Sequence, residues 1–447
     1  MRNIKSISSR IVIGFLLLLL GNCQSGTSDA HRALEVVLQW NRYLLELERY
    51  TEGYRPPVAS RVYAYVGLTA YEAALPALKN YTSFAKTYPH CTLPPVPGAA
   101  DFHLPSALNA AYARIMVRFF EMARLDKFRG ISKLEDSFQK QFEDLNTETV
   151  RNTSIAYGQA VADSIYKWSS TDTHAHLANL HAYDPHFTSP PEPGKWQSAN
   201  MEPTPALLPH WGKTRPFLLV LEDYQQRAPM EFSKQPGSPF YSQAFEVYSI
   251  SHPLSDENQW VADFWSDDHP GLTFTAPGRW ISVTNQVIAA ECADVAQALE
   301  VYLKVGIALC DASILCWKLK YQYLVERPHT YIDSYIEKGW RPYSESPPFP
   351  SYPSGHSTFG SAAAEVLQAF FGNYAMTDNS HEGRVEFNGK PRHFKSFQEM
   401  ALENAYSRMS IGVHYRMDCE EGLRLGKFVG DLVARLNLHD PQMIGQR

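Results

Sequence analysis

Three short blocks in the last third of the chain carry side chains that could together hold a small oxyanion. The blocks are Lys320-x6-Arg327-Pro328, Pro353-Ser354-Gly355-His356 and Ser407-Arg408-x5-His414-x3-Asp418. They supply three cations, a hydroxyl, a glycine that a ligand can approach closely and two imidazoles. These groups are what a tetrahedral or trigonal-bipyramidal oxyanion requires. The inventory therefore predicts vanadate or phosphate chemistry.

The first block predicts a helix with its functional side chains on one face. Trp317, Lys320 and Arg327 follow one another at spacings of three and seven residues, which place side chains on a common helical face. Pro328 disfavours helical backbone at Arg327, so this guanidinium is expected at the helix end, within reach of a pocket. Charged residues at helical spacing usually just face solvent. This block therefore indicates a functional site only in combination with the other two blocks.

The second block lies where a loop gives way to a helical pattern. The N-terminus of that helix would present unpaired N–H groups and the positive end of its dipole to an anion. Ser354 can offer its hydroxyl to the ligand, cap the helix, or do both, and Gly355 has no Cβ to block approach. His356 is then expected beside the oxyanion as an acid or a base.

The third block requires a break in its helix. On an ideal helix Arg408 and His414 would point about 120° apart, and Gly412 offers the break that lets them share a ligand. Asp418 is expected to orient the second ring nitrogen of His414. With Glu421 it also resembles a capping motif for the following helix. The spacing predicts that His414 is a ligand or a nucleophile.

In this order and at this spacing, the blocks resemble those of the vanadium-dependent haloperoxidases and the type 2 phosphatidic acid phosphatases, a superfamily with one shared active site. The resemblance covers residues 315–420. It implies that vanadate is the cofactor, that hydrogen peroxide and halide are the substrates, and that His414 binds vanadium. His356 and Lys320 would be catalytic, with Lys320 polarising peroxide and Asp418 supporting His414. The vanadate oxygens would be held by Lys320, Arg327, Ser354, Gly355 and Arg408.

The same residues could instead perform phosphoryl transfer. By resemblance to the phosphatases, His414 would attack phosphorus to form a phosphohistidine, and His356 would protonate the leaving alcohol. Trp317 and Phe349 favour the haloperoxidase, because they match aromatic positions on the halide side of haloperoxidase pockets, and an apolar wall desolvates a soft halide. Phe349 resembles the chloroperoxidases, whereas Tyr321 resembles bacterial iodide- or bromide-using relatives. Iodide or bromide is expected, since chloride oxidation demands the strongest oxidant.

The N-terminus predicts export. Three cations and the apolar run 11–20 precede Cys23, and this run is too short to span a bilayer. Residues 1–22 resemble a bacterial lipoprotein signal, with Cys23 acylated and residues 23–30 as a tether; an ordinary signal peptide is the alternative. The expected location is the periplasm or the outer membrane, in contact with lipid only through the anchor. A non-catalytic lipoprotein is the third hypothesis for function.

Composition excludes several other classes of protein. With 447 residues and 44% hydrophobic content, the chain can bury a large core, and its net charge of −6 argues against a nucleic-acid partner. The five cysteines after Cys23 lie in scattered apolar contexts that do not indicate a disulfide framework, and without a Cys-x2-Cys pair a zinc site is not expected. Asp172-x-His174-x-His176 is a weak candidate for a divalent metal.

Hydrophobic periodicity predicts an all-α protein with long proline-rich loops. Residues 31–215 are expected to form an N-terminal helical bundle with a proline-rich loop over 170–217, and residues 216–447 a C-terminal helical domain that carries the site. The resemblance implies two four-helix bundles. Helices are expected over 31–50, 57–78, 105–125, 131–147, 153–169, 238–250, 255–265, 277–290, 293–325, 356–372, 397–411 and 419–437.

Overall fold

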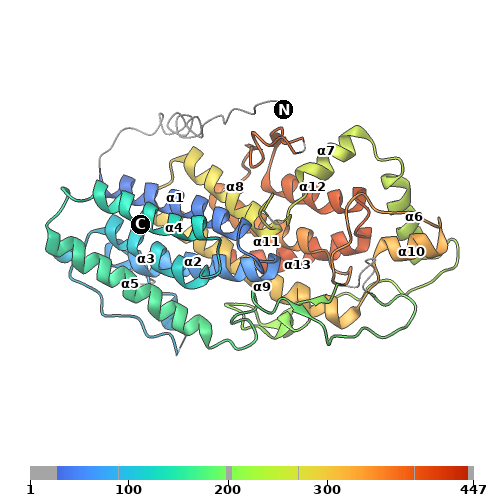
Figure 1. Cartoon of the computed structure of the whole chain (residues 1–447), viewed down its shortest axis with the longest axis horizontal. Coiled ribbons are helices and arrows are strands. Elements are labelled where there is room, and N and C mark those ends of the chain that lie inside the picture. The colour runs from blue at the N-terminus through green and yellow to red at the C-terminus, as the bar shows by residue number, and fades with distance from the viewer. Residues whose placement is uncertain (1–27, 89, 198–203, 270, 387, 441–447) are drawn as a thin grey trace, which may run out of the picture.

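The computed structural model describes residues 28–88, 90–197, 204–269, 271–386 and 388–440, and it is built of helices joined by long loops (Figure 1). The helices are α1 Asp29–Arg49, α2 Pro56–Ala74, α3 Leu104–Phe119, α4 Leu125–Gln141, α5 Glu148–Ser170, α6 Pro239–Ser251, α7 Asp256–Phe264, α8 Ala276–Glu291, α9 Val295–Tyr323, α10 Pro328–Tyr335, α11 Gly355–Phe371, α12 Phe397–Ser410 and α13 Arg416–Ala434. The strands are β1 Tyr183–Asp184, β2 Ala206–Leu207, β3 Met376–Asp378 and β4 Arg392–Phe394, paired antiparallel as β1–β2 and β3–β4. The predicted all-α class is confirmed.

Local sequence explains where many of these helices begin. Side-chain oxygens accept a hydrogen bond from the first helical turn at several N-caps, and proline often occupies one of the first two helical positions, where its missing N–H costs nothing. The capping residues are Ser28, Thr147, Ser238, Ser255, Thr275, Asp294, Ser354 and Ser396.

Helix α9 is the centre of the molecule. Every residue from Ala298 to Trp317 is buried, because α2 packs along one side of α9 while α11 and α13 pack along another. In Figure 1, α1–α5 gather on the left and α6, α7, α10 and α12 on the right, with α8, α9, α11 and α13 between them. One continuous apolar core includes side chains of α1, α2, α9, α11 and α13. The predicted domain boundary at 215/216 stays a prediction.

Helices α11 and α13 pack backbone to backbone beside the site. A Cβ on Gly422 of α13 would come within 2.6 Å of the carbonyl oxygen of Ser354, which is closer than any side chain tolerates. The backbone N–H of Ser354 donates to the carbonyl oxygen of Asp418 at 2.9 Å. The second and third motif blocks are therefore brought together by this close helix pair.

Several expected elements differ from those observed. Helix α4 begins six residues earlier than expected, at Leu125, and α10 was not expected at all, because Pro328 was interpreted as a helix terminator whereas it occupies a favourable first helical position. The two pairs of short strands were also missed. The loop between α5 and α6 is largely irregular, as predicted, with β1 and β2 inside it.

Other expectations concern the cysteines and the N-terminus. Cys91, Cys310, Cys316 and Cys419 are buried free thiols. The predicted signal over residues 1–22 and the acylated Cys23 lie outside the described residues. Among the helices that the structure describes, none is both long and apolar enough to cross a membrane.

Candidate functional site

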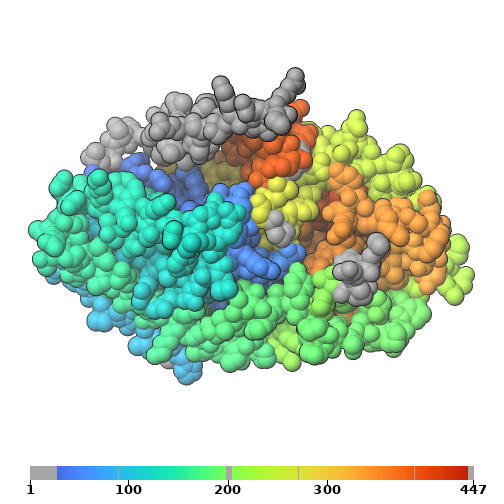
Figure 2. Space-filling view, viewed as in Figure 1, coloured from blue at the N-terminus to red at the C-terminus, as the bar shows by residue number. Residues whose placement is uncertain are grey.

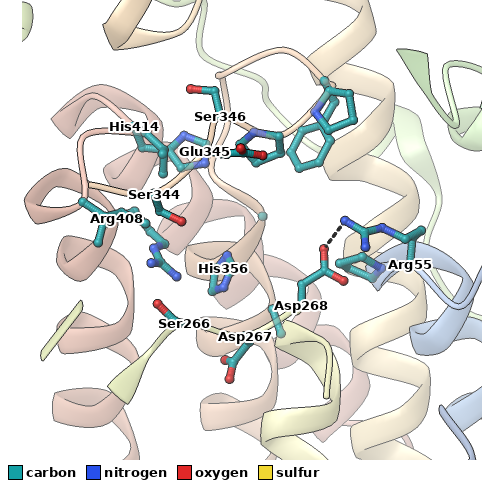
Figure 3. Close-up of a pocket in the computed structure, with 18 of the residues that line it drawn as sticks. Arg55, Ser266, Asp267, Asp268, Ser344, Glu345, Ser346, His356, Arg408 and His414 are labelled. Carbon is teal, nitrogen blue, oxygen red and sulfur yellow. Dashed lines mark ion pairs between the residues drawn. The ribbon is translucent and has the colours of Figure 1, made fainter. Parts of the chain in front are cut away.

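The three motif blocks meet at a cavity of about 460 Å³ between the two sides of the molecule (Figure 3). Trp317, Phe349, Gly355, His356, Arg408 and His414 line the cavity. Lys320, Arg327, Ser354 and Asp418 lie directly behind this lining and are also buried. The structure therefore brings together every residue of the predicted site, in two layers.

Lys320 is fixed by main-chain acceptors. Its ammonium group donates to the carbonyl oxygens of Pro350 at 2.9 Å, Ser351 at 3.0 Å and Pro353 at 2.5 Å. All three hydrogens are thus used by the loop that leads into the second block. Burial lowers the pKa of Lys320, so the ammonium depends on these carbonyls for its charge. In this structure Lys320 shapes the loop, and its predicted contact with the oxyanion stays a prediction.

Arg327 does not belong to the helix that carries Lys320. Helix α9 ends at Tyr323 and Leu324 is left-handed with φ 53°, so Arg327 becomes the N-cap of α10. The common helical face expected for three residues holds only for Trp317 and Lys320. Arg327 donates to the carbonyl oxygens of Phe349 at 3.0 Å and Val413 at 2.8 Å, and its Nη1 lies 3.1 Å from His414 Nε2. It still reaches across to the third block, as predicted.

His414 is held in one orientation by two neighbours. Its Nδ1 lies 2.9 Å from Asp418 Oδ2, and the same carboxylate oxygen accepts hydrogen bonds from the Ser351 hydroxyl and from the N–H of Tyr415. Because Asp418 accepts at Nδ1 and Arg327 donates toward Nε2, the proton is assigned to Nδ1 and the lone pair to Nε2. His414 therefore presents an unprotonated nitrogen at the cavity.

Asp418 also caps α13, although at a different position from the one expected. It is the third residue of α13 and forms a capping box with Tyr415, the N-cap. Glu421 is not part of this cap: it accepts a hydrogen bond from the Tyr224 hydroxyl at 2.7 Å and pairs with Arg424. The predicted capping motif of Asp418 with Glu421 is therefore wrong, because α13 begins three residues earlier than expected.

The second block forms the start of α11. Ser354 is the N-cap, and its hydroxyl oxygen accepts from the N–H of Ser357, so the capping role is present. A Cβ on Gly355 would meet only the rings of Trp317 at 3.6 Å and Phe359 at 3.8 Å, which is ordinary contact. Gly355 also lines the cavity, so no side chain of its own separates its backbone from the cavity. His356 is the next residue and lines the cavity.

Arg408 and His414 face the same cavity because the chain turns sharply between them. Helix α12 ends at Ser410, Gly412 adopts φ 82°, and α13 begins at Arg416. A Cβ on Gly412 would also lie 2.7 Å from the Trp340 ring. The predicted break at Gly412 is confirmed. Arg408 Nη1 donates to the carbonyl oxygen of Trp265 at 2.6 Å, which anchors the guanidinium.

One wall of the cavity is aromatic. The ring centroids of Trp317 and Phe349 lie 5.2 Å apart, and Trp317 Nε1 donates to the carbonyl oxygen of Leu207 at 3.3 Å. Arg327 and Lys320 lie over the Phe349 ring at 4.8 and 5.0 Å. Apolar rings beside cations lower the local dielectric and strengthen the attraction for an anion.

Charge and hydrogen-bonding capacity remain unsatisfied at this site. Arg327 Nη2, Arg408 Nε and His356 Nε2 are buried and have no hydrogen-bond partner among the described residues. Desolvation and the neighbouring cations Arg327 and Lys320 hold the pKa of His414 well below its usual range, and desolvation with Arg408 does the same for His356. Both imidazoles are therefore neutral near pH 7, beside two guanidinium groups. Unpartnered buried polar groups are costly, and a tetrahedral oxyanion such as vanadate would accept hydrogen bonds from the two guanidinium groups.

Some lining residues carry no motif and come from distant segments. Arg55 from the start of α2, and Ser266, Asp267, Asp268 and His269 from the loop after α7, line the same cavity. Asp267 is buried and pairs with Arg279 at 2.9 Å, and burial raises its pKa to about 6. Ser351, which contacts both His414 and Asp418, was also missed, although it lies within three residues of the second block.

The weak metal candidate in the long loop does not form a cluster. Asp172 accepts from the N–H of Arg215 at 3.1 Å and lies near Arg61, while the His176 ring packs against Tyr166. Across the part of the chain that the structure describes, no group of three or more His, Cys, Asp or Glu side chains is placed to hold a metal ion.

Comparison with known proteins places these features in a family. Residues 300–439 match the family described as the VCPO second helical-bundle domain. The chain is 28% identical to the vanadium chloroperoxidase of Curvularia inaequalis over 213 residues, which is 35% of this chain and 35% of that protein. It is 34% identical to the vanadium-dependent bromoperoxidase of Ascophyllum nodosum over 94 residues, 19% of this chain and 17% of that protein. These alignments span about a third of the relatives' length or less.

Solved structures extend the likeness to nearly the whole chain. A crystal structure described as the first bacterial vanadium-dependent iodoperoxidase superposes with a TM-score of 0.81 at 29% identity, covering 94% of this chain and 100% of that one. A bacterial vanadium-dependent chloroperoxidase in its apo form gives a TM-score of 0.63 at 16% identity, covering 83% and 92%, and shows a shared fold. Motif order, helical architecture and these likenesses agree, and the chain belongs to the vanadium haloperoxidase superfamily.

Proposed function

We propose that this protein oxidises halide with hydrogen peroxide at a vanadate bound by His414, with iodide or bromide preferred over chloride. The observation that carries the proposal is the set of unpartnered buried nitrogen atoms of Arg327, Arg408 and His356 beside the neutral His414. Likeness to a bacterial iodoperoxidase over most of the chain supports the choice of halide.

Different residues of the chain have different roles in the proposed reaction. When bound, vanadate would supply a Lewis acid that makes a peroxide oxygen electrophilic, while the oxidation state of vanadium stays unchanged. Arg327 and Arg408 offset the charge of the anion, and Gly355 leaves room for it. Halide, peroxide and one proton give hypohalous acid and water. His356 Nε2 is free to accept the peroxide proton and to return it to the departing oxygen.

The aromatic wall acts on the halide. A large, weakly hydrated anion loses little hydration energy beside Trp317 and Phe349, whereas a polar phosphoester gains nothing from these rings. The wall also keeps bulk water away from the oxidising centre.

A vanadate titration tests the proposed function. We expect iodide oxidation, followed as triiodide, to be absent from vanadate-free protein and to rise with vanadate until one site is filled. Hydrolysis of p-nitrophenyl phosphate by the vanadate-free protein is measured in parallel. Strong hydrolysis without halide turnover would identify a phosphatase that uses His414 as a nucleophile, and the absence of both activities would favour a non-catalytic binding protein.

Gly355→Ala separates ligand space from protein stability. The new methyl group fits against Trp317 and Phe359, so we expect an unchanged melting temperature, but it fills space in front of the α11 N-terminus. Vanadate affinity should therefore fall, because the methyl group keeps the anion away from the N–H groups at the start of α11. Gly98→Ala is the matched control, because Gly98 has an ordinary φ of −62° and its Cβ would make only an ordinary contact with Asp101 Oδ2 at 3.5 Å, outside the site. A variant that binds vanadate normally would contradict the assignment.

We also propose that the protein is exported and anchored to the cell envelope through an acylated Cys23. The support is the sequence of residues 1–23. Two or three acyl chains hold a protein at a membrane, whereas one barely does. Cys23→Ser should release the protein from the membrane fraction or leave the signal uncut, as judged by fractionation and by the mass of the N-terminal peptide. A wild-type chain that is wholly released, with another N-terminal residue, would refute the anchor.

A further inference from the structure

A second cavity, of about 1170 Å³, lies beside the oxyanion pocket. It is bounded by residues 48–55 between α1 and α2, by residues 179–183 of the long loop, by residues 271–275 before α8, and by Met122 with Arg124. The face of the molecule in Figure 2 is hollowed where the blue and teal N-terminal residues meet the yellow segment. The cavity is large enough for a small organic molecule.

The two cavities share one wall. Arg55, Tyr183 and Asp268 line both of them. Arg55 and Asp268 form an ion pair of 2.7 Å, and in Figure 3 this pair lies across the pocket from Arg408 and His414, with His356 between. A molecule that passes from the pocket into the second cavity on this side therefore passes close to Tyr183.

The backbone of Tyr183 is tied to the aromatic wall of the site. Tyr183 in β1 is opposite Leu207 in β2. The carbonyl oxygen of Leu207 accepts from Trp317 Nε1 at 3.3 Å and from the Tyr321 hydroxyl at 2.6 Å. This hydrogen-bonded connection fixes the Tyr183 backbone relative to the pocket, while Tyr183 as a whole is 41% exposed.

We propose that Tyr183 is a self-halogenation site on the route by which oxidised halogen leaves the pocket. The inference rests on the proposed halide oxidation, which supplies hypohalous acid. A ring carbon next to the phenol oxygen donates an electron pair to the halogen, and the bond between oxygen and halogen breaks to release hydroxide. The ring carbon then loses its proton, which joins hydroxide as water. Halogen is reduced as carbon is oxidised, and the product is a halotyrosine.

Exposure alone does not distinguish Tyr183 from other tyrosines. Tyr335 is 40% exposed and Tyr343 48% exposed, yet neither lines either cavity. A freely diffusing oxidant would label all three to similar extents. An oxidant released at the shared wall reaches Tyr183 at a high local concentration first.

The experiment compares these three tyrosines in the full-length, vanadate-loaded protein. Hydrogen peroxide and iodide are added for a limited number of turnovers, with free methionine in solution to remove released oxidant, and peptides are analysed by mass spectrometry. We expect iodination of Tyr183 to exceed that of Tyr335 and Tyr343 by about tenfold, as local generation predicts. Vanadate-free protein treated with iodine from solution gives the intrinsic reactivity of each ring, and there the preference should vanish. Tyr183→Phe should lose the label from that peptide.

Each outcome decides the question. Equal labelling of the three tyrosines during turnover, in the ratio given by external iodine, would overturn the inference. An unlabelled Tyr183, together with triiodide formation in parallel samples without methionine, would overturn it as well, while leaving the proposed function intact. Failure to form triiodide in parallel samples without methionine would overturn both.

Discussion

Replacing His414 with alanine is expected to abolish vanadate binding and, with it, halide oxidation. His414 Nε2 is the unprotonated nitrogen at the cavity, fixed from behind by Asp418 and flanked by Arg327. Without it the arginines can still attract an anion, but nothing completes the coordination of vanadium. Vanadium content after gel filtration and the rate of triiodide formation measure the two losses separately.

Asp418→Asn is a milder substitution at the same site and should weaken vanadate binding without abolishing it. It keeps the imidazole but weakens the acceptor at Nδ1, and second-layer partners of this kind typically contribute about 10–100-fold in metal affinity. We therefore expect weaker vanadate binding that excess vanadate restores. A His414→Ala protein that retains stoichiometric vanadium would show that His414 is not the ligand.

Replacing His356 with alanine is expected to separate binding from turnover. The Nε2 atom of His356 is buried without a partner among the described residues, and the imidazole is neutral near pH 7. If His356 transfers the peroxide proton, the kcat of the His356→Ala protein should fall by about 10²–10⁴-fold, the usual contribution of a positioned acid or base. Much of the vanadium should stay bound. Rates at saturating vanadate and bound vanadium in the same preparation provide the measurement.

His356→Gln serves as the control, because an amide fills the same space without transferring a proton. Loss of turnover in both variants with vanadium retained would fit the acid–base role. Equal loss of vanadium from the His356 and His414 variants would mean that the two roles have been assigned wrongly.

Much of the fold could be predicted because the helices have strong apolar periodicity and clear caps. The errors are local: Pro328 stops one helix and starts another, and sequence alone favoured the first effect. The short strands were missed because segments of two or three residues show no alternation to detect. Helix α4 began earlier than expected because its first turn, with Leu125 and Asp126, is largely exposed.

The same contrast holds for the site: residues in local sequence patterns could be predicted, and residues that only the fold brings together could not. Residues within the three blocks could be found because their types and spacing are unusual together, and the cavity contains or adjoins all of them. Arg55, Asp267 and Asp268 could not be found, because single charged residues far along the chain carry no pattern, and only the fold brings them to the cavity. Ser351 could have been found, since a hydroxyl two residues before the second block can donate a hydrogen bond to a carboxylate such as Asp418.

The position of α9 has a consequence for how this protein can be divided. A fragment comprising residues 216–447 would retain every motif, yet it would expose the side of α9 that α2 covers and would lack the Arg55 wall of the pocket. Large exposed apolar faces drive aggregation. Truncation or domain exchange near residue 215 would therefore cost solubility and the shape of the cavity together.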